Sequence, residues 1–410
     1  MKIAVVEIGE PLPAEGRVRF HRSALFMKYL ASKGHSVTWW TSTFSHASKR
    51  QVFKKDKCTM WDGVKIQYLH IPGYKKNISI KRFIHEYSFA KKLVKKLEQS
   101  KDSVNIFYLP IPTISAAFHV ARFAKEKKIP FVIDILDRWP DAIVNIAPNI
   151  LRPVIRLLFF PFFSQMRFVA SNASGIWGCS DNYQKYGNSF RKISSIQPQE
   201  YIFPIGYERL SESRPLVDNA KIQLKMYGLD RSTYNLFFVG TIGRYFEIEL
   251  LIDAARFYES SNPEIKFIIA GDGSSLQGYK KYADNLSNIV FLGWIDAPMI
   301  QACLEVSHVG LAPYNSKDIF ALPNKPFEYM SAGLPIISSI QTELPKILEK
   351  NQCGITYQVG ALGELLAAIK TYSNPEIREQ ASKSSKRLYD THYSSSMVNN
   401  FAEKMLIKLS

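Results

Sequence analysis

The chain has 410 residues, of which 46% are hydrophobic and 22% are charged. This composition excludes a disordered or collagen-like chain and is sufficient for two α/β domains. The formal net charge is +17, and basic runs such as "SKRQVFKKDK" and "AKKLVKKLEQSK" lie mostly in the first half. We expect that half to bind something anionic: nucleic acid, a phosphorylated substrate or an anionic membrane.

The cysteines and the first residues indicate a compartment. Four scattered cysteines (Cys58, Cys179, Cys303 and Cys353) show no paired spacing. This favours buried thiols in a reducing compartment over a disulfide framework or a zinc site. The opening "MKIAVVEIGE" is typical of a strand and lacks the basic start and long apolar run of a signal peptide. We therefore expect a cytoplasmic protein.

In the first half, apolar runs of strand length alternate with helical patterns. We expect helices over 21–34 and 114–128, and strands over 2–8, 35–42, 104–110, 130–136, 174–180 and 192–198. This alternation indicates a doubly wound parallel sheet. The pattern lapses in a polar stretch after residue 205, broken by Gly206 and Pro215. We place the domain boundary there, with a first domain over 1–205.

The apolar segment 151–170, "LRPVIRLLFFPFFSQMRFVA", is interrupted by Arg152, Arg156 and Arg167 and by two prolines. A bilayer-spanning helix needs about 20 largely uncharged residues, so this segment is a poor candidate for one. Two readings remain open. It is either a basic, aromatic helix that lies in the membrane interface or a core helix of the first domain.

The second half repeats the alternation. We expect a helix over 247–260 and strands over 234–240, 265–271, 288–294, 308–314, 334–340 and 354–359. This predicts a second Rossmann-like domain over 206–391, followed by a helical tail.

Several familiar sites are excluded. A dinucleotide fold needs G-x-G-x-x-G after its first strand, whereas this chain has "EIGEPLPAEGRVRF" with glycines at other spacings. There is no Walker A sequence, no HExxH and no cluster of histidines and cysteines. We therefore expect neither nicotinamide chemistry, nor ATP hydrolysis, nor a metal site.

Candidate ligand loops follow the strands, where doubly wound folds bind ligands. In the first half, the long loop "GEPLPAEGRVRFHR" leads to the head of a helix, a place suited to an anion. It carries Gly16, Arg17, Arg19, His21 and Arg22. A second loop, "DRWPD", brings Asp137, Arg138, Trp139 and Asp141 after a buried strand. Asp137 could instead be an N-cap.

Two glycine-rich strand ends in the second half suit a phosphate. "FVGTIGR" places Gly240, Gly243 and Arg244 together, and "IAGDGSSL" places Gly271, Asp272 and Gly273. Glycine allows a ligand to approach the backbone, and arginine binds phosphate oxygens with a fork of donors.

The stretch "NKPFEYMSAGLPII" predicts a short helix from Asn324, ended by a left-handed Gly333 and by Pro335. Glu328 stands one turn into this helix. Its carboxylate either accepts hydrogen bonds from ligand hydroxyl groups or caps its own helix.

The ordered motifs "FVGTIGR", "IAGDGSSL", "VFLGWID" and "NKPFEYMSAGLPII" resemble the retaining glycosyltransferases of family four. The likeness covers nearly the whole chain and is closest to the bacterial enzymes that build surface polysaccharides. It implies an α/β protein of the GT-B fold. Two Rossmann-like, doubly wound parallel-sheet domains would face a central cleft, and a C-terminal helix (392–410) would return to the first domain.

The resemblance also implies roles for residues. Glu328 would accept hydrogen bonds from the ribose, while Lys325, Asn324 and Arg244 would hold the diphosphate. The other donor-binding positions would be Gly240, Gly243, Gly271, Asp272, Gly273, Pro313, Leu322 and Pro323. Asp137 and Arg138 would join Glu328 as catalytic residues, facing the donor sugar. The acceptor would be bound by Gly16, Arg17, Arg19, His21, Arg22 and Trp139.

Two positions depart from the family pattern. Phe320 stands where members often carry a second glutamate, which puts the identity of the sugar in doubt. The stretch "RYFEIE" lacks a lysine that members tend to place after the arginine, so Lys325 is the candidate lysine for the diphosphate.

The expected function is metal-independent transfer of a sugar, without a cofactor, from a UDP-sugar to a glycan acceptor. We expect that acceptor to be linked to a lipid such as polyprenyl diphosphate. The protein would be peripheral on the inner face of an anionic cell membrane. The alternatives are a sugar-nucleotide 2-epimerase or another GT-B enzyme, such as a phosphorylase. A non-catalytic, nucleic-acid-binding protein is a third reading, but the sequence holds no nucleic-acid motif.

Overall fold

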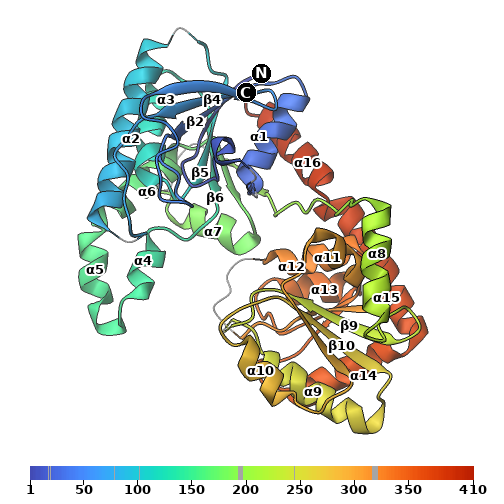
Figure 1. The fold of residues 1–410 in the computed structure, drawn as a ribbon. Coiled ribbons are helices and arrows are strands. Elements are labelled where there is room, and N and C mark those ends of the chain that lie inside the picture. Colours follow the sequence, from blue (N-terminus) through green and yellow to red (C-terminus); the bar gives the residue numbers. More distant parts are fainter. Residues whose placement is uncertain are drawn as a thin grey trace. The chain divides into compact units, whose positions relative to one another are not determined.

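The computed structural model describes residues 1–16, 18, 20–77, 79–100, 102–192, 197–243, 245–315 and 322–410. Its contacts divide the chain into two compact units. Unit 1 comprises Met1–Pro204 and Asn399–Ser410, and unit 2 comprises Ile205–Val398. Each unit is an α/β sandwich built on one sheet (Figure 1), as expected from the alternating sequence pattern.

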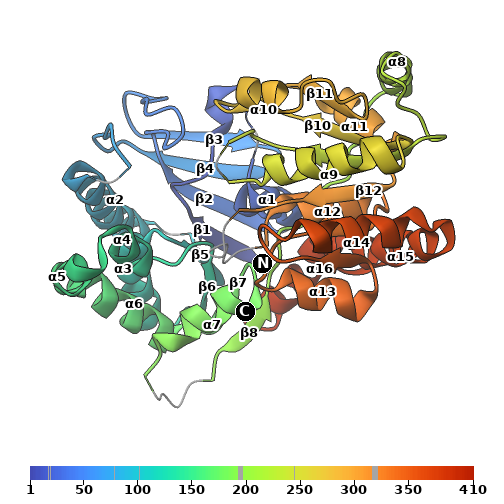
Figure 2. The same ribbon diagram turned by 90° about the horizontal axis from the view of Figure 1, so that it is seen from below.

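The sheet of unit 1 has eight strands in the order β3-β4-β2-β1-β5-β6-β7-β8 (Figure 2). Neighbouring strands are parallel, except for the antiparallel pair of β3 and β4. The strand bounds are β1 Lys2–Val6, β2 Ser36–Ser42, β3 Lys57–Trp61, β4 Val64–Leu69, β5 Ile106–Ile111, β6 Phe131–Ile135, β7 Gly175–Gly178 and β8 Gln199–Ile202.

Helices cover both faces of this sheet, which explains why central strands such as β5 and β6 are buried along their whole length. Figure 1 shows α2 (Ile80–Gln99), α3 (Ile114–Glu126) and α6 (Phe160–Asn172) on one face. The other face carries α1 (Arg22–Ser32) and the C-terminal α16 (Ser395–Ile407). Tyr29 and His35 both hydrogen-bond Glu403, so the last residues of the chain belong to unit 1.

The sequence patterns assigned no element to residues 43–103, where the structure has β3, β4 and α2. The hairpin turns at Asp62 and Gly63, whose φ values of 44° and 81° are those of a type I′ turn. An Asp-Gly pair between two short strands is the local signal for this hairpin. The hairpin was not expected from the sequence, because β3 is an edge strand with no buried residue and so shows no apolar pattern.

The sheet of unit 2 has six parallel strands in the order β11-β10-β9-β12-β13-β14. Their bounds are β9 Tyr234–Val239, β10 Ile265–Ala270, β11 Ile289–Gly293, β12 Val309–Ala312, β13 Ile336–Ser338 and β14 Gly354–Thr356. All six lie within the strands expected from the sequence.

The helices of unit 2 lie on both faces of its sheet. Figure 1 shows α9, α10 and α14 on one side of β9 and β10, and α11, α12 and α13 on the other. The bounds are α8 Arg214–Lys225, α9 Ile248–Ser261, α10 Leu276–Tyr282, α11 Ala297–Val306, α12 Asn324–Ser331, α13 Leu344–Asn351, α14 Leu362–Ser373 and α15 Pro375–Leu388. The polar stretch after residue 205, in which no element was expected, contains α8.

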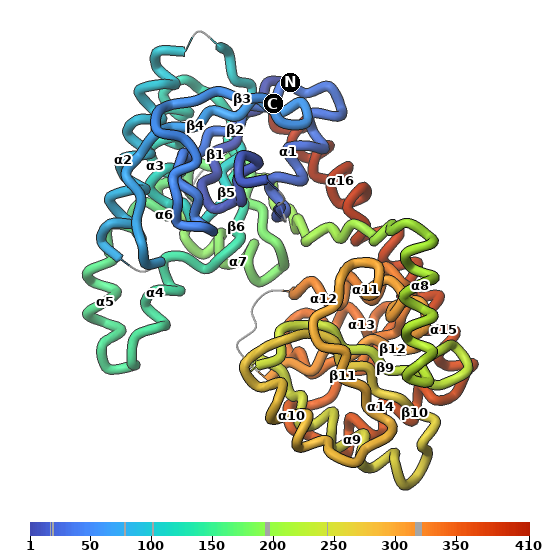
Figure 3. Tube along the Cα trace, in the orientation of Figure 1, coloured from blue at the N-terminus to red at the C-terminus, as the bar shows by residue number. Residues whose placement is uncertain are grey.

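The segment 151–170 divides into two parts that behave differently. Helix α6 buries Phe163, Met166, Val169 and Ala170 and is a core helix. By contrast, α5 (Arg152–Leu158) buries no residue at all. With α4 (Asp141–Ile146) it forms a hairpin that extends away from the sheet of unit 1 (Figure 3).

No single helix among the described residues has the length and apolar character to cross a membrane. One bent pair, Asn149–Leu158 with Phe160–Asn172, passes the same test jointly, with an angle of 65° between its helices.

Candidate functional site

Helix α12 is fixed to the sheet of unit 2 by Tyr329. Its hydroxyl donates a hydrogen bond to the Leu311 carbonyl of β12 (3.0 Å), and its ring is fully buried. A Cβ atom on Gly310 would lie 2.3 Å from the ring of Tyr329, so only glycine leaves room for it. At the helix end, Gly333 adopts φ +73° and α12 stops, as the sequence predicts. This holds the first turn of α12 at a fixed place after β12.

Glu328 lies on this anchored helix, half-buried. Its Oε1 accepts a hydrogen bond from the Tyr207 hydroxyl at 2.9 Å. Tyr207 is itself held firmly, because its backbone carbonyl accepts hydrogen bonds from the Tyr389 hydroxyl and the Ser395 amide, each at 3.0 Å. The Tyr207 hydroxyl therefore helps to orient the carboxylate. No sequence motif pointed to Tyr207.

Lys325 lies over two aromatic rings. Its Nζ is 4.8 Å from the ring centroid of Phe246 and 5.7 Å from that of Phe238. A Cβ atom on Gly240 would lie 2.6 Å from the same Nζ. Gly240 therefore leaves the space that the ammonium group occupies. Phe246, from the stretch "RYFEIE" that lacks a second lysine, contacts Lys325 through its ring.

The two glycine loops pack against each other backbone to backbone. A Cβ atom on Gly271 would lie 1.8 Å from the Gly240 carbonyl oxygen, and one on Gly273 would lie 2.0 Å from that of Ile242. Gly271 also has φ +136°, which side chains rarely adopt. We expected these glycines to admit a ligand. In the structure Gly271 and Gly273 admit the neighbouring loop, whereas Gly243 has open space where a side chain would be.

The remaining donor positions surround α12. Asp272 Oδ1 accepts the Gly273 amide at 2.7 Å, and the Pro313 carbonyl accepts the amide of Glu247 at 2.8 Å. Leu322 is buried, Pro323 precedes the first turn of α12, and Asn324 is exposed. Arg244 and Phe320 lie outside the described residues.

In unit 1, the head of α1 was expected to bind an external anion, and this expectation requires a correction. Glu10, in the loop after β1, already accepts hydrogen bonds from backbone amides at the head of α1. Glu10 Oε2 accepts the His21 amide at 2.9 Å, and Oε1 accepts the Ala24 amide at 3.1 Å. His21 remains exposed, and Gly16 is exposed at φ +88°. Arg17 and Arg19 lie outside the described residues.

Arg22 also differs from its expected acceptor-binding role. Its guanidinium is buried and pairs with Asp134 in the middle of β6 at 2.5 Å, 4.3 Å from the ring centroid of Phe203. Asp134 accepts a second hydrogen bond from the Tyr108 hydroxyl. This ion pair belongs to the core beneath α1, so Arg22 does not lie on an acceptor-binding surface. A single sequence cannot distinguish a buried arginine from an exposed one in the same loop.

The four candidates in the loop after β6 all have local contacts. Asp137 Oδ1 accepts the amide of the next residue, Arg138, at 2.7 Å, and the N-cap of α4 is Pro140 rather than Asp137. The Arg138 guanidinium lies 5.1 Å from the ring centroid of Tyr186. Trp139 is buried, with the guanidinium of Arg82 4.7 Å above its ring. Asp141 continues into α4, where it bonds Tyr186 and Arg156.

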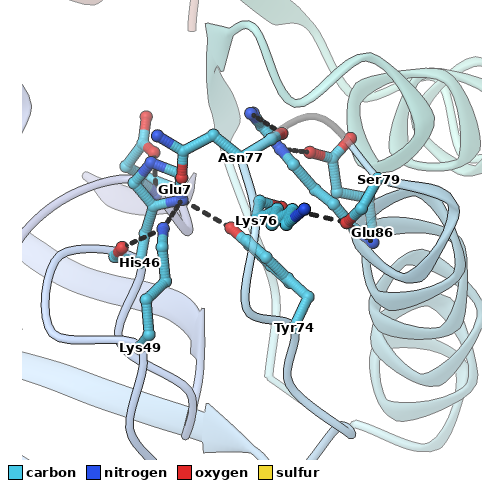
Figure 4. A network of polar contacts seen from close by, with 10 residues as sticks. Glu7, His46, Lys49, Tyr74, Lys76, Asn77, Ser79 and Glu86 are labelled. Atoms are coloured by element: carbon cyan, nitrogen blue, oxygen red, sulfur yellow. Dashed lines mark hydrogen bonds and ion pairs between the residues drawn. The ribbon is translucent and has the colours of Figure 1, made fainter.

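A polar cluster that the sequence did not reveal lies beside this loop (Figure 4). It joins the loop after β2, the segment after β4 and the start of α2. Its members are His46, Lys49, Tyr74, Arg82 and Glu86. In the described part of the chain, no group of three or more His, Cys, Asp or Glu side chains is placed to hold a metal ion.

Comparisons with known proteins agree with this architecture. Residues 233–374 match the family model described as "Glycosyl transferases group 1". The alpha-monoglucosyldiacylglycerol synthase of Streptococcus pneumoniae (strain ATCC BAA-255 / R6) is 21% identical over 306 residues, covering 69% of this chain. The alignment spans 65% of that relative, just under two thirds of its length.

Solved structures show the same fold. Anabaena HepE in complex with UDP superimposes with a TM-score of 0.65 at 13% identity, covering 100% of both chains. WaaG, a glycosyltransferase involved in lipopolysaccharide biosynthesis, gives 0.59 at 15% identity, covering 98% of both chains. The fold is thus GT-B, and unit 2 carries a glycosyltransferase group 1 domain.

Proposed function

We propose that this protein is a retaining, metal-independent glycosyltransferase that moves a sugar from UDP to a lipid-linked acceptor at an anionic membrane. Its place would be the cytoplasmic face of the cell membrane, in the synthesis of a bacterial surface polysaccharide. The observation that carries the proposal is the exposed apolar hairpin of α4 and α5. It belongs to the unit whose sequence holds most of the basic runs. The GT-B relatives support the donor, since HepE was solved with UDP.

On the donor side, α12 supplies the chemistry that a diphosphate leaving group requires. The start of α12 carries the positive end of the helix dipole, and Lys325 adds a positive charge there. These groups would offset the negative charge that develops on the diphosphate as the sugar bond breaks. Glu328, oriented by Tyr207, would accept hydrogen bonds from the ribose hydroxyls. In unit 1, Asp137 and Arg138 are the further proposed catalytic residues.

On the acceptor side, the α4–α5 hairpin exposes an apolar surface to solvent. Ile150 is 85% exposed and Leu157 is 74% exposed. Their exposed apolar neighbours are Ile146, Leu151, Val154, Leu158 and Phe160. A group of exposed apolar side chains on one short hairpin is typical of a site that binds protein or membrane.

The arginines of this segment brace the hairpin. Arg156 Nη1 donates to Asp141 Oδ1 at 3.0 Å, and Arg152 donates to the carbonyls of Ala147 and Asn145 at 3.2 and 3.3 Å. The apolar side chains are therefore presented on a supported structure rather than on a loose loop. Basic residues beside them would add attraction to anionic lipid headgroups.

The acceptor has two candidate classes. WaaG is described as acting in lipopolysaccharide biosynthesis, and the curated relative is named for a glycosylated diacylglycerol. Both names involve a lipid, which supports a membrane-bound acceptor for this chain. The glycan-lipid acceptor is our first choice, and a diacylglycerol is the second candidate.

The proposal is tested by incubating the protein with radiolabelled UDP-glucose, UDP-galactose or UDP-N-acetylglucosamine and bacterial membrane lipids. We expect label to enter the organic phase with one UDP-sugar, and the Glu328→Gln variant to lose that transfer. Conversion of the UDP-sugar to an isomer without any lipid would instead support the epimerase alternative. Absence of both reactions across all donors would contradict the proposal.

A further inference from the structure

Unit 1 carries a compact polar cluster whose function is not explained by the core or by the donor site (Figure 4). His46 Nδ1 and the Tyr74 hydroxyl are 2.5 Å apart. Lys49 Nζ donates to the His46 carbonyl at 2.5 Å and lies 5.0 Å from the ring centroid of Tyr74. Tyr74 packs in turn against the buried His85 of α2, 5.4 Å between ring centroids. These contacts fix the loop after β2 to the segment after β4.

Positive charge is concentrated here. Burial, together with Lys49, Arg82 and His85, lowers the pKa of His46 to about 4. Burial and Arg82 also lower the pKa of the Lys49 ammonium group. Arg82 has one carboxylate partner, Glu86, at 2.9 Å, and that side chain is 5% exposed. Lys49 and Arg82 therefore lie near each other, with Glu86 as the ion-pair partner of Arg82. The second carboxyl in Figure 4, Glu7, has its pKa raised to about 8 by burial, so the cluster keeps positive charge that suits an added anion.

The cluster lies on the carboxyl side of β2 and β4. These strands are parallel, so the loops that follow them, and the loop after β1, meet at one edge of the sheet. Ligands of doubly wound folds bind at this edge. The loop after β6, with Asp137 and Trp139, leaves the same edge.

The cluster continues into an apolar surface through Arg82. The guanidinium stacks 4.7 Å above Trp139, whose ring lies 6.4 Å from that of Phe83. Phe83 packs against Phe159 and Phe162, at 5.6 and 5.2 Å between centroids. Those two residues lead directly to the exposed α4–α5 hairpin. A charged site and an apolar surface are thus joined by a chain of ring contacts within one unit.

We infer that His46, Lys49 and Arg82 bind the phosphate or diphosphate headgroup of an amphiphilic acceptor whose apolar chain follows Trp139 and Phe83 toward α5. This inference rests on the proposed function and names the class of acceptor. A phosphate ester supplies the anion that the two cations lack, and its hydrocarbon chain matches the aromatic and apolar surface beside them. The neutral His46 ring and the Tyr74 hydroxyl can add hydrogen bonds to the phosphate oxygens.

The test measures the binding of three soluble probes by calorimetry: farnesyl diphosphate, inorganic pyrophosphate and farnesol. We expect farnesyl diphosphate to bind more tightly than either of its parts. Lys49→Gln should weaken the binding of farnesyl diphosphate and pyrophosphate about tenfold, as expected for a lost charged hydrogen bond, without affecting farnesol. Lys95→Gln, which removes the same charge from an exposed position of α2, is the matched control.

Arg82→Gln combined with Glu86→Gln is the second variant, because removing Arg82 alone would leave a buried carboxylate. We expect a similar loss of farnesyl diphosphate binding at an unchanged melting temperature. Equal weakening by Lys95→Gln, or unaltered binding by Lys49→Gln, would overturn the inference. So would farnesol binding as tightly as farnesyl diphosphate, since the headgroup would then contribute nothing.

Two further measurements are needed. One distinguishes an acceptor phosphate from the phosphate of bilayer lipids, and the other distinguishes failure of this site from failure of the proposed function. Flotation with phosphatidylglycerol vesicles should be the same for Lys49→Gln and the wild type. A loss with those vesicles would mean that the site reads bilayer phospholipid, which overturns the acceptor assignment. Stabilisation by UDP should also be unchanged in Lys49→Gln. If UDP binds neither the wild type nor any variant, the proposed function fails. The binding of farnesyl diphosphate still tests this site in that case.

Discussion

In both units, candidate ligand-binding loops lie at the carboxyl edge of the sheet, but the residues that form this edge differ. In unit 2 the edge consists of glycine backbone, one short helix and a lysine over two phenylalanines. In unit 1 it consists of buried ionisable side chains next to exposed apolar helices. Backbone amides suit a ligand of fixed geometry such as a nucleotide. Side-chain clusters with an apolar border suit an amphiphile.

The largest effect should come from breaking the glycine packing of unit 2. Gly271→Ala would place a Cβ atom 1.8 Å from the Gly240 carbonyl oxygen, at φ +136°. We expect the free energy of unfolding to fall by about 4 kcal/mol, because backbone strain and overpacking add. Urea denaturation followed by circular dichroism measures this change.

Gly363→Ala is the control for that substitution. Gly363 lies in the first turn of α14, has no neighbouring atom within 4 Å of its built Cβ atom and does not adopt a positive φ. We expect stability to be unchanged or slightly raised, since alanine favours a helix. A loss equal to that of Gly271→Ala would show that the loop contact is not the cause.

A second prediction concerns the apolar hairpin of unit 1. Leu157→Ser with Leu158→Ser removes two exposed leucines from α5. If they enter a bilayer, vesicle binding should weaken by about 3 kcal/mol, while stability in solution stays the same. Flotation with anionic vesicles gives the partition coefficient. Ile222→Ser, at a residue that is 62% exposed on α8 of unit 2, should leave that coefficient unaltered.

A third prediction follows from the buried carboxylates of unit 1. Burial, with help from Glu10, raises the pKa of Glu7 from 4.5 to about 8. Between these two values the unfolded chain has lost the proton that the folded chain keeps, so this group makes stability fall as pH rises. Glu7→Gln cannot ionise, and its carbonyl can still accept the Gly9 amide that Glu7 Oε1 binds at 2.5 Å.

The wild type should therefore lose stability relative to Glu7→Gln by roughly 3 kcal/mol as the pH rises from about 5 to about 8. Urea denaturation at several pH values measures the difference. A gap that stays constant over this range would contradict a raised pKa for Glu7.

The smallest effect should come from the link to Glu328. Tyr207→Phe removes the hydroxyl that donates to Glu328 Oε1. Affinity for UDP should fall by about 1 kcal/mol, the net value of one hydrogen bond. Calorimetric titration with UDP measures this, and unchanged affinity would mean that Tyr207 does not orient the carboxylate. Tyr389→Phe removes a hydrogen bond to the Tyr207 backbone and should have a weaker effect.

The sequence predicted elements well where apolar periodicity was strong. All six strands of unit 2 and the end of α12 at Gly333 follow from runs of buried residues and from glycine and proline signals. The Asp62–Gly63 hairpin was missed because the edge strand β3 buries none of its residues. Helix α2 buries Phe89, Leu93 and Leu97 at helical spacing, but its lysines were interpreted only as a basic run. The apolar periodicity of a sequence reflects which residues are buried, so it does not reveal an element that is mostly exposed.

The candidate sites were predictable only in part. The motif around Glu328 located α12, but its partner Tyr207 lies 121 positions away and carries no motif of its own. The cluster of His46, Tyr74 and Arg82 joins three separate segments, which only the fold brings together. The opposite error occurred at α1, where Arg22 and the helix amides are used internally by Asp134 and Glu10. Residue type indicates what a group can bind, whereas packing decides what it does bind.

The most direct test of the donor site is a thermal-shift panel of UDP, GDP, ADP, CMP and TDP with wild type and Glu328→Gln. The variant keeps the shape of the side chain and a hydrogen-bond acceptor but loses the charge. We predict that UDP alone raises the melting temperature of the wild type and that the variant loses most of this shift. No shift with any nucleotide, or an equal shift in both proteins, would contradict the role assigned to Glu328 on α12.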